Sequence, residues 1–323
     1  MLIEIRRVEA IFRYPVKSMA GERLEAAELG WHGLEGDRRL AFRRINNSSG
    51  FPWLSASQLP DLLRFTPLRR AGDAGEDAAH RGGDVRENAP GDLHLPTHIR
   101  TPDGEDLPVF GEALAAEVGR RYGAPVQMLQ LRHGIFDEAT ISVIASATVR
   151  EIGRLAGLTP DVQNPDVRTP DVQSLDVQSL DARSLGVQSL DIRRFRPNVV
   201  VRLLRPVPFQ EDQWLGGVLS FGKKQKKSKN KKKADDDDAP AITVTMRDVR
   251  CSMVNLDPDS ASPAPEVLKA VVRAHQNTAG IYGAVTRTGR LVVGQSVFLR
   301  AGAETPAVVS SVSKAGGPDL EGE

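Results

Sequence analysis

The chain has 323 residues, of which 40% are hydrophobic and 26% are charged, enough for a sizeable core in one large domain or two modest ones. Its single cysteine excludes an internal disulfide, and it excludes zinc or iron–sulfur sites built on several thiolates. No run is long and apolar enough to span a bilayer, and residues 1–7 lack the apolar centre of a signal peptide. We therefore expect a cytoplasmic protein with no membrane span.

Charge is distributed unevenly, although the formal net charge is only +1. Residues 223–238 hold eight lysines and four aspartates, so the rest of the chain is slightly acidic. A basic surface for nucleic acid is not indicated outside this run, and no nucleic-acid partner is expected. We interpret the run as a solvated hairpin tip, with nuclear targeting or an anionic partner as the less favoured alternative.

The N-terminal half alternates short strands with turns, which indicates a small antiparallel barrel or sandwich. Between the first two strands, a proline and a glycine bracket a loop that presents Lys17 and Ser18. Three glycines within residues 30–36 bend the backbone and direct Asp37 and Arg38. The elements predicted in this half are strands at 2–14, 23–29, 40–45, 95–101 and 126–131, and a helix at 110–122.

The C-terminal half has the same character, with two short helices among its strands. Ser146 is predicted to be the N-cap of the first helix. Residues 219–222 and 242–245 are expected to pair as a hairpin, because they flank the charged run. The elements predicted here are helices at 147–156 and 265–276, strands at 141–144, 195–201, 218–221, 241–246 and 283–287, and a last strand pair within 290–301.

Low-complexity segments interrupt these elements. Residues 71–92 are rich in Gly, Asp, Glu and Ala and predict a flexible surface loop. Residues 159–193 repeat every five residues, which we interpret as a mostly disordered insertion rather than a small solenoid, because seven units make fewer than two coils. The tail 303–323 is expected to be disordered.

Cys251 follows an alternating strand pattern and precedes an Asp-Pro-Asp turn. Arg247 and Arg250 are close in sequence, and a neighbouring cation favours the thiolate, which is both nucleophile and metal ligand. A buried structural cysteine is the competing interpretation of this stretch alone, since free cysteines are often buried.

The ordered segments together resemble the MOSC family, preceded by the small β-barrel domain that accompanies it in YcbX-type proteins and in the mitochondrial amidoxime-reducing component. Where these relatives continue with a Thr-rich stretch after the cysteine, this chain has Ser252–Asn255, a difference that bears on the substrate. The motifs that carry the resemblance are Tyr14–Ser18 with Gly21, Gly33 with Gly36–Arg38, Phe195–Val199, Phe209–Trp214 with Gly217, and Arg250–Cys251 with Asp257–Pro258.

The resemblance implies a mainly β fold with some helices (α+β) and two domains. A small N-terminal β-barrel domain would occupy residues 1–130 and include the loop 71–92. A MOSC β-barrel domain would occupy residues 131–302 and include the insertions 159–193 and 223–238.

The resemblance also implies a molybdenum cofactor, in which a molybdopterin holds the metal; an association with pyridoxal phosphate binding is left open at the family level. Cys251 would ligate molybdenum, since a soft thiolate suits a sulfur-bound metal. Asp257 would position a water or relay a proton, unless Asp257–Asp259 is only a turn. The cofactor contacts expected are Lys17, Ser18, Arg38 and Arg196 at the phosphate, Asn198 at the pterin edge, and Ser146 at a helix start.

Three functions follow from these residues. The first is a molybdenum-cofactor oxidoreductase that reduces a small N-hydroxylated substrate, with a separate electron donor such as a ferredoxin, a flavodoxin or a cytochrome b5-like reductase system. The second is a sulfur carrier or transfer protein that uses a persulfide on Cys251. The third is a protein that binds or stores the cofactor without turnover.

Overall fold

The computed structural model describes residues 2–47, 50–69, 94–158, 190–222 and 239–302. The interpretations of 71–92, 223–238 and the tail, and of nearly all of 159–193, lie outside these residues. None of the helices in the described part is both long and apolar enough to cross a membrane.

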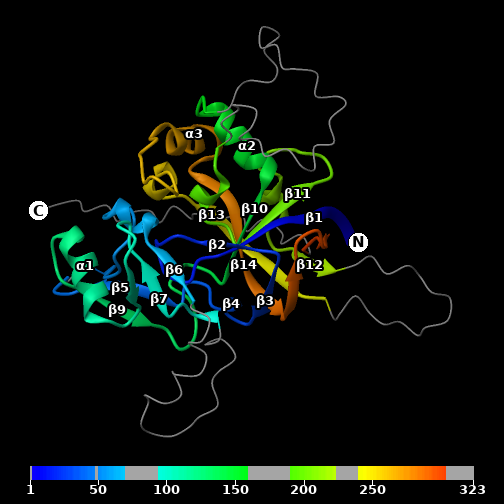
Figure 1. Cartoon of the computed structure of the whole chain (residues 1–323). Coiled ribbons are helices and arrows are strands. Elements are labelled where there is room, and N and C mark those ends of the chain that lie inside the picture. Colours follow the sequence, from blue (N-terminus) through cyan, green and yellow to red (C-terminus); the bar gives the residue numbers. More distant parts are fainter. Residues whose placement is uncertain (1, 48–49, 70–93, 159–189, 223–238, 303–323) are drawn as a thin grey trace, which may run out of the picture.

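Seven strands close into a barrel, which Figure 1 shows as the larger lobe. The order around it is β11-β10-β14-β13-β12-β16-β1, and β1 also pairs with β11, so no barrel edge is left open. Only β10 and β11 run parallel. The strands are β1 (Leu2–Arg13), β10 (Ile141–Ala145), β11 (Val199–Leu203), β12 (Val218–Gly222), β13 (Ala241–Val249), β14 (Thr278–Arg287) and β16 (Ser296–Arg300).

The expected hairpin across the charged run is confirmed, because β12 and β13 pair antiparallel with Leu219 opposite Ile242. The last strand pair is corrected. β15 (Gly289–Val292) pairs with β3 (Ala26–Gly30), which also pairs with β4 (Gly33–Leu34), whereas β16 pairs with β1 and β12. These two neighbours in sequence therefore belong to different sheets.

Strand β1 shows how the sequence pattern builds two cores at once. Val8 and Ile11 face the barrel interior, whereas Ala10 and Phe12 face outward. The outward residues pack under α2 (Ser146–Leu155) and α3 (Glu266–His275), which contact each other beside the barrel (Figure 1). The predicted strand 23–29 is split into β2 (Glu22–Leu24), which extends the sheet from β1, and β3.

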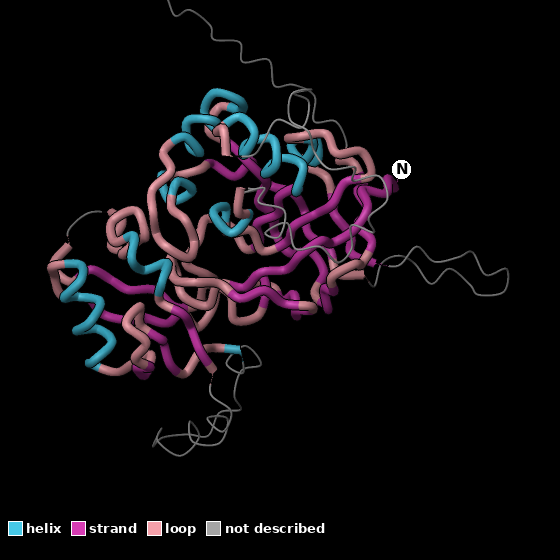
Figure 2. Tube along the Cα trace, turned by 45° about the horizontal axis from the view of Figure 1, so that its top comes forward, coloured by secondary structure: helices cyan, strands magenta, loops and turns pink. Residues whose placement is uncertain are grey.

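A smaller lobe has its own core, which includes Val16, Phe42 and Leu114, and Figure 2 shows it beside the barrel. In the described residues its strands form one sheet of two strands and one of three. Its elements are β5 (Leu40–Arg44) paired with β9 (Val126–Gln130), the sheet of β6 (Thr66–Leu68), β7 (His98–Arg100) and β8 (Asp106–Pro108), and α1 (Glu112–Tyr122). The mainly β fold with some helices is confirmed.

The predicted division at residue 130 remains a prediction about the folding units. The strand pairing crosses this division, because β1, the first strand of the chain, closes the barrel by pairing with β11 and β16. The core of the smaller lobe begins at Val16, directly after β1. The chain thus enters the barrel first, leaves it for the smaller lobe, and returns at β10.

Glu211, in the 3₁₀ helix Gln210–Trp214, is a fully buried carboxyl that contacts the start of α2. Its two oxygens accept hydrogen bonds from the backbone N–H of Ala145 (3.2 Å) and the hydroxyl of Thr148 (2.9 Å). Burial raises the pKa of Glu211 to about 7, against 4.5 for an ordinary glutamate. Between these two values the folded protein keeps a proton that the unfolded chain releases.

Glu211 should therefore make the protein less stable as pH rises from about 4.5 to about 7. Glu211→Gln keeps the carbonyl acceptor and removes the titration, so the variant should gain stability relative to the parent over this range, by at most roughly 3 kcal/mol. Urea unfolding of both proteins at pH 5 and pH 8 measures this difference. An equal stability difference at the two pH values would contradict the assignment.

Candidate functional site

The backbone crossing between the lobes places the first predicted site residues. After β1, Val16 bridges to Leu40, and the Lys17 N–H donates to the Leu40 carbonyl at 2.7 Å. Ser18 then takes a positive φ of 65°, which turns the chain. Lys17 and Ser18 are thereby held between the core of the barrel lobe and the core of the smaller lobe.

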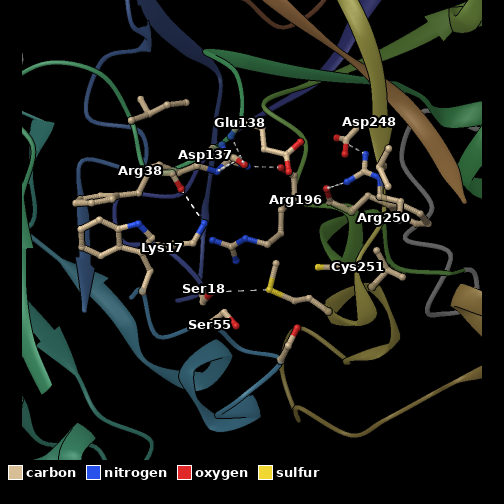
Figure 3. Close-up of a pocket in the computed structure, with 18 of the residues that line it drawn as sticks. Lys17, Ser18, Arg38, Ser55, Asp137, Glu138, Arg196, Asp248, Arg250 and Cys251 are labelled. Carbon is tan, nitrogen blue, oxygen red and sulfur yellow. Dashed lines mark hydrogen bonds and ion pairs between the residues drawn. The ribbon is translucent and has the colours of Figure 1, made fainter. Parts of the chain in front are cut away.

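A cavity of about 630 Å³, the main cavity, opens at this crossing. Its walls come from both lobes: residues 51–57 after β5, residues 131–138 after β9, residues 194–196 before β11, and residues 248–254 around the end of β13. Figure 3 shows Lys17 and Cys251 projecting toward it from opposite sides. The structure brings together five of the predicted site residues there, Lys17, Ser18, Arg38, Arg196 and Cys251.

Arg38 organises the buried polar groups beside the main cavity. Its guanidinium donates to the Asp37 carboxylate (2.5 Å) and pairs with the Asp137 carboxylate (2.8 Å). It also donates to the Asn198 side-chain oxygen (3.2 Å) and the Arg196 carbonyl (2.7 Å). Burial alone would lower the pKa of Arg38, but the Asp37 and Asp137 carboxylates raise it above its ordinary value.

The glycine-rich turn before Arg38 has the bent backbone that the sequence predicts. Gly33 and Gly36 have φ values of +98° and +82°. A Cβ at Gly33 would lie 2.0 Å from the carbonyl oxygen of Thr140, so no side chain fits there. The turn thus brings Asp37 and Arg38 into the interior.

Asn198 has a structural place rather than a place in the cavity wall. Its side-chain oxygen accepts from Arg38 and from the Ser142 N–H (3.0 Å), and its amide donates to the Phe12 carbonyl (3.4 Å). These bonds tie β1, β10 and the segment before β11 together. Asn198 therefore acts on the cavity through Arg38.

Two arginines offer buried donors to the main cavity. Arg196 is 7% exposed and donates through Nη1 to the Met19 carbonyl, but its Nη2 has no hydrogen-bond partner among the described residues. The Nε of Arg194 is likewise unpartnered there. Burial lowers the pKa of Arg196 to about 10, because the charge has little solvent around it. Buried donors of this kind call for an acceptor.

Cys251 is exposed, so the interpretation as a buried structural cysteine is wrong. It lies two residues after β13, at the start of the 3₁₀ helix Ser252–Asn255. The cations expected near it point elsewhere, since Arg250 pairs with Asp248 (2.6 Å) and Arg247 with Asp212 (2.7 Å). Lys17 faces the thiol across the main cavity, which Arg194 and Arg196 also line.

Lys17 and Asp137 form the second charged feature of the main cavity. The Lys17 ammonium donates to the Phe136 carbonyl at 2.8 Å, and burial lowers its pKa. Burial acts to raise the pKa of Asp137, but Arg38 and Lys17 together hold it below the ordinary value. Asp137 also accepts from the Tyr282 hydroxyl at 3.2 Å and remains a carboxylate at neutral pH.

Ser146 and Asp257 lie outside the residues that line the main cavity. Ser146 is the first residue of α2, and Ala145 is its N-cap, which corrects the predicted cap by one position. Asp257 accepts from the backbone N–H groups of Asp259 (3.1 Å) and Ser260 (2.9 Å) and pairs with Arg194 at 3.2 Å. The contacts of Asp257 are therefore those of a turn residue. Asp257 reaches the main cavity only through its ion pair with Arg194.

One wall of the main cavity is aromatic and was not predicted from the sequence. Phe136 is buried and packs edge-on against Trp53, with ring centroids 4.6 Å apart, and half-exposed Phe51 lies beside the Lys17 ammonium. Asp137, Glu138 and Asp248 were missed as well, because no spacing pattern connects these single polar residues to a cavity.

Removing the Arg38 guanidinium should leave the buried Asp37 carboxylate without an ion-pair partner and Asp137 with Lys17 as its neighbouring cation. Arg38→Met is expected to lower the free energy of unfolding by about 3–5 kcal/mol. Arg120→Gln, which removes an exposed pair with Glu117 on α1, should change it by about 1 kcal/mol at most. Chemical unfolding of both variants measures the difference, and similar losses would contradict the central role of Arg38.

Two family models match the chain: the MOSC N-terminal beta barrel domain over residues 5–110 and the MOSC domain over residues 172–298. No curated protein matches it. The crystal structure of the YuaD protein from Bacillus subtilis is similar at a TM-score of 0.41 and 12% identity, over 94% of this chain and 98% of that one. That likeness is too low to support an inference, so the family models decide. The chain belongs to the MOSC family, with a MOSC N-terminal beta barrel domain ahead of its MOSC domain.

Proposed function

We propose that this protein is a molybdenum-cofactor-dependent oxidoreductase that reduces N-hydroxylated compounds, such as amidoximes or hydroxylaminopurines, with Cys251 as the protein ligand to the metal. One observation carries the proposal. The exposed Cys251 thiol shares the main cavity with buried, unpartnered nitrogens of Arg194 and Arg196. A soft ligand and donors for an anion thus meet in one place.

The donor set fits this cofactor better than a bare metal ion. The described residues contain no group of three or more His, Cys, Asp or Glu side chains that could hold a metal. A metal already held by two dithiolene sulfurs needs only one more soft ligand, which Cys251 can provide. The phosphate of such a cofactor would take the unpartnered Arg196 Nη2 and Arg194 Nε, with Lys17 nearby.

The remaining residues divide into those that would touch the cofactor and those that support them. Ser18 would add a hydroxyl, which in the cofactor-free protein lies 3.9 Å from the Met253 sulfur. Arg38 would hold the backbone of Arg196 in place by donating to its carbonyl. Asn198 would support the same segment by accepting from the Ser142 N–H. When bound, the cofactor would supply the two-electron chemistry.

Reductive cleavage of an N–O bond consumes two electrons and two protons and releases water. Asp248 lines the main cavity, and burial raises its pKa to about 7 although its ion pair with Arg250 at 2.6 Å acts to lower it. The aromatic wall of Trp53 and Phe136 would exclude water from the opposite side. Asp248 is thus the protein group best suited to deliver a proton to the leaving oxygen.

Electrons would come from another protein. The chain contains one cysteine, which cannot hold an iron–sulfur cluster. We propose a separate donor, such as a ferredoxin, a flavodoxin or a cytochrome b5-like reductase system.

A sulfur carrier is the second candidate, and the exposure of Cys251 favours it. A thiol open to solvent can receive a sulfur atom from a partner's persulfide by thiol exchange. The unpartnered arginine nitrogens would then hold an anionic acceptor of that sulfur.

Protein purified from a host that makes the cofactor should contain about one molybdenum and one pterin per chain. Cys251→Ser should keep the pterin, because the phosphate contacts remain, and should lose amidoxime reduction when an electron donor is supplied. Arg120→Gln, on the distant face of α1, is the matched control and should keep both. Metal analysis, pterin fluorescence and a reduction assay measure these quantities.

Unchanged activity in Cys251→Ser would contradict the ligand assignment. A preparation without metal or pterin but with a persulfide on Cys251, detected by mass spectrometry, would replace the reductase with the sulfur carrier.

Asp257→Asn separates the two interpretations of the Asp-Pro-Asp turn. The amide keeps one acceptor for the Asp259 and Ser260 N–H groups and loses the pair with Arg194. A role through Arg194 predicts weaker cofactor retention with the kcat of loaded protein unchanged. A direct proton relay predicts normal retention with a lower kcat, so pterin content and kcat measured on one preparation distinguish the two.

A further inference from the structure

A second cavity of about 320 Å³ lies behind Arg196. Its walls also come from both lobes: residues 63–66 around β6, residues 100–104 after β7, and residues 193–196 and 258–259 of the MOSC part. Tyr14 and Gly21 line it as well. Cys251, Lys17 and the aromatic wall do not, so its only residue in common with the main cavity is Arg196.

The buried floor of the second cavity offers donors without partners. Tyr14 is 1% exposed, yet its hydroxyl has no hydrogen-bond partner among the described residues. The guanidinium of Arg196 lies over the Tyr14 ring, 4.1 Å from its centroid, and its Nη2 is also unpartnered there. A buried hydroxyl and a buried guanidinium nitrogen without acceptors cost stability unless something binds them.

The ring of Tyr14 is held in this position by its neighbours. A Cβ at Gly21 would lie 2.3 Å from the ring atom Cε1, so only glycine allows the ring to rest on this backbone. The guanidinium groups of Arg196 and Arg38 lie over the ring, 4.1 Å and 5.1 Å from its centroid. The hydroxyl therefore cannot turn away to find solvent.

The rim of the second cavity is basic and already paired. Arg64, Arg100 and Arg193 line it. Arg64 pairs with Asp61 (2.9 Å), Arg100 with Asp106 (2.8 Å), and Arg193 with Asp191 and Asp259 (both 2.6 Å). Asp259 is the carboxylate that lines this cavity, and it shares Arg193 with Asp191. The buried Arg196 has no ion-pair partner among the described residues and supplies the positive charge at the floor.

We propose that the second cavity is a binding site for a small oxyanion, a phosphate or carboxylate group, held by the Tyr14 hydroxyl and Arg196 Nη2. The guanidinium nitrogen can only donate and the hydroxyl can donate beside it, so together they favour an anion over a cation. Because Arg196 lines both cavities, an anion here would draw one of its N–H groups away from the main cavity. The site does not depend on the proposed function, since it needs no cofactor.

Titration of the cofactor-free protein with inorganic phosphate, followed by calorimetry at constant ionic strength, tests the site. Tyr14→Phe keeps the ring beneath Arg196 and removes only the hydroxyl, so it should weaken binding about tenfold. Tyr122→Phe, in α1, is the matched control and should bind like the parent. Lys17 lines only the main cavity, so Lys17→Met should weaken phosphate binding far less than Tyr14→Phe does.

Equal phosphate affinity in Tyr14→Phe and the parent would overturn the proposal. So would a loss confined to Lys17→Met, because it would place the anion in the main cavity. In phosphate-free buffer, Tyr14→Phe should have the same Tm as the parent or a higher one, since it removes an unpartnered polar group. A lower Tm would show that the hydroxyl has a protein partner and would also overturn the proposal.

Crystals of the unaltered chain soaked in selenate test the site without any substitution. The anomalous signal of selenium should lie between the Tyr14 hydroxyl and Arg196. Its absence there at saturating selenate would contradict the site.

Discussion

The buried guanidinium of Arg38 is the interaction on which the site depends. It joins Asp37 of the glycine-rich turn, Asp137 after β9, and Asn198 and the Arg196 carbonyl before β11. A planar fork of donors suits this task, since it can reach several acceptors in fixed directions at once. These four acceptors come from three segments that are far apart in the sequence, so one side chain links all three.

The main cavity follows from this arrangement. Apolar side chains fill the two cores on either side of the crossing at residues 14–18, and the boundary between the cores is left to charged groups. Most of these charges are paired with one another, which makes the exceptions informative. Among the described residues, Arg194, Arg196 and Tyr14 keep buried atoms without a hydrogen-bond partner, whereas Arg38 and Arg250 are satisfied within the protein. The exposed Cys251 shares the main cavity with Arg194 and Arg196.

The barrel does not follow the order of the sequence motifs. β1 lies within the residues matched by the N-terminal family model, yet it hydrogen-bonds between β11 and β16 of the barrel. The seven strands therefore cannot close without the start of the chain. A boundary drawn from sequence at residue 130 cannot reveal this, because the pairing of β1 connects residues about two hundred positions or more apart.

The sequence by itself determined the seven strands of the barrel, the hairpin of β12 and β13, and the family, but not β6 and β8 of the smaller lobe. Periodicity is local, and family motifs are short runs that keep their order. It also identified Lys17, Ser18, Arg38, Arg196 and Cys251, all of which line the main cavity. Only the tertiary structure decided that Asn198 supports Arg38, that Asp257 contacts its own turn and Arg194, and that the arginines near Cys251 pair elsewhere. The physical reason is that a polar side chain's role depends on which distant groups are left unpaired after the cores have packed, and no local pattern records that.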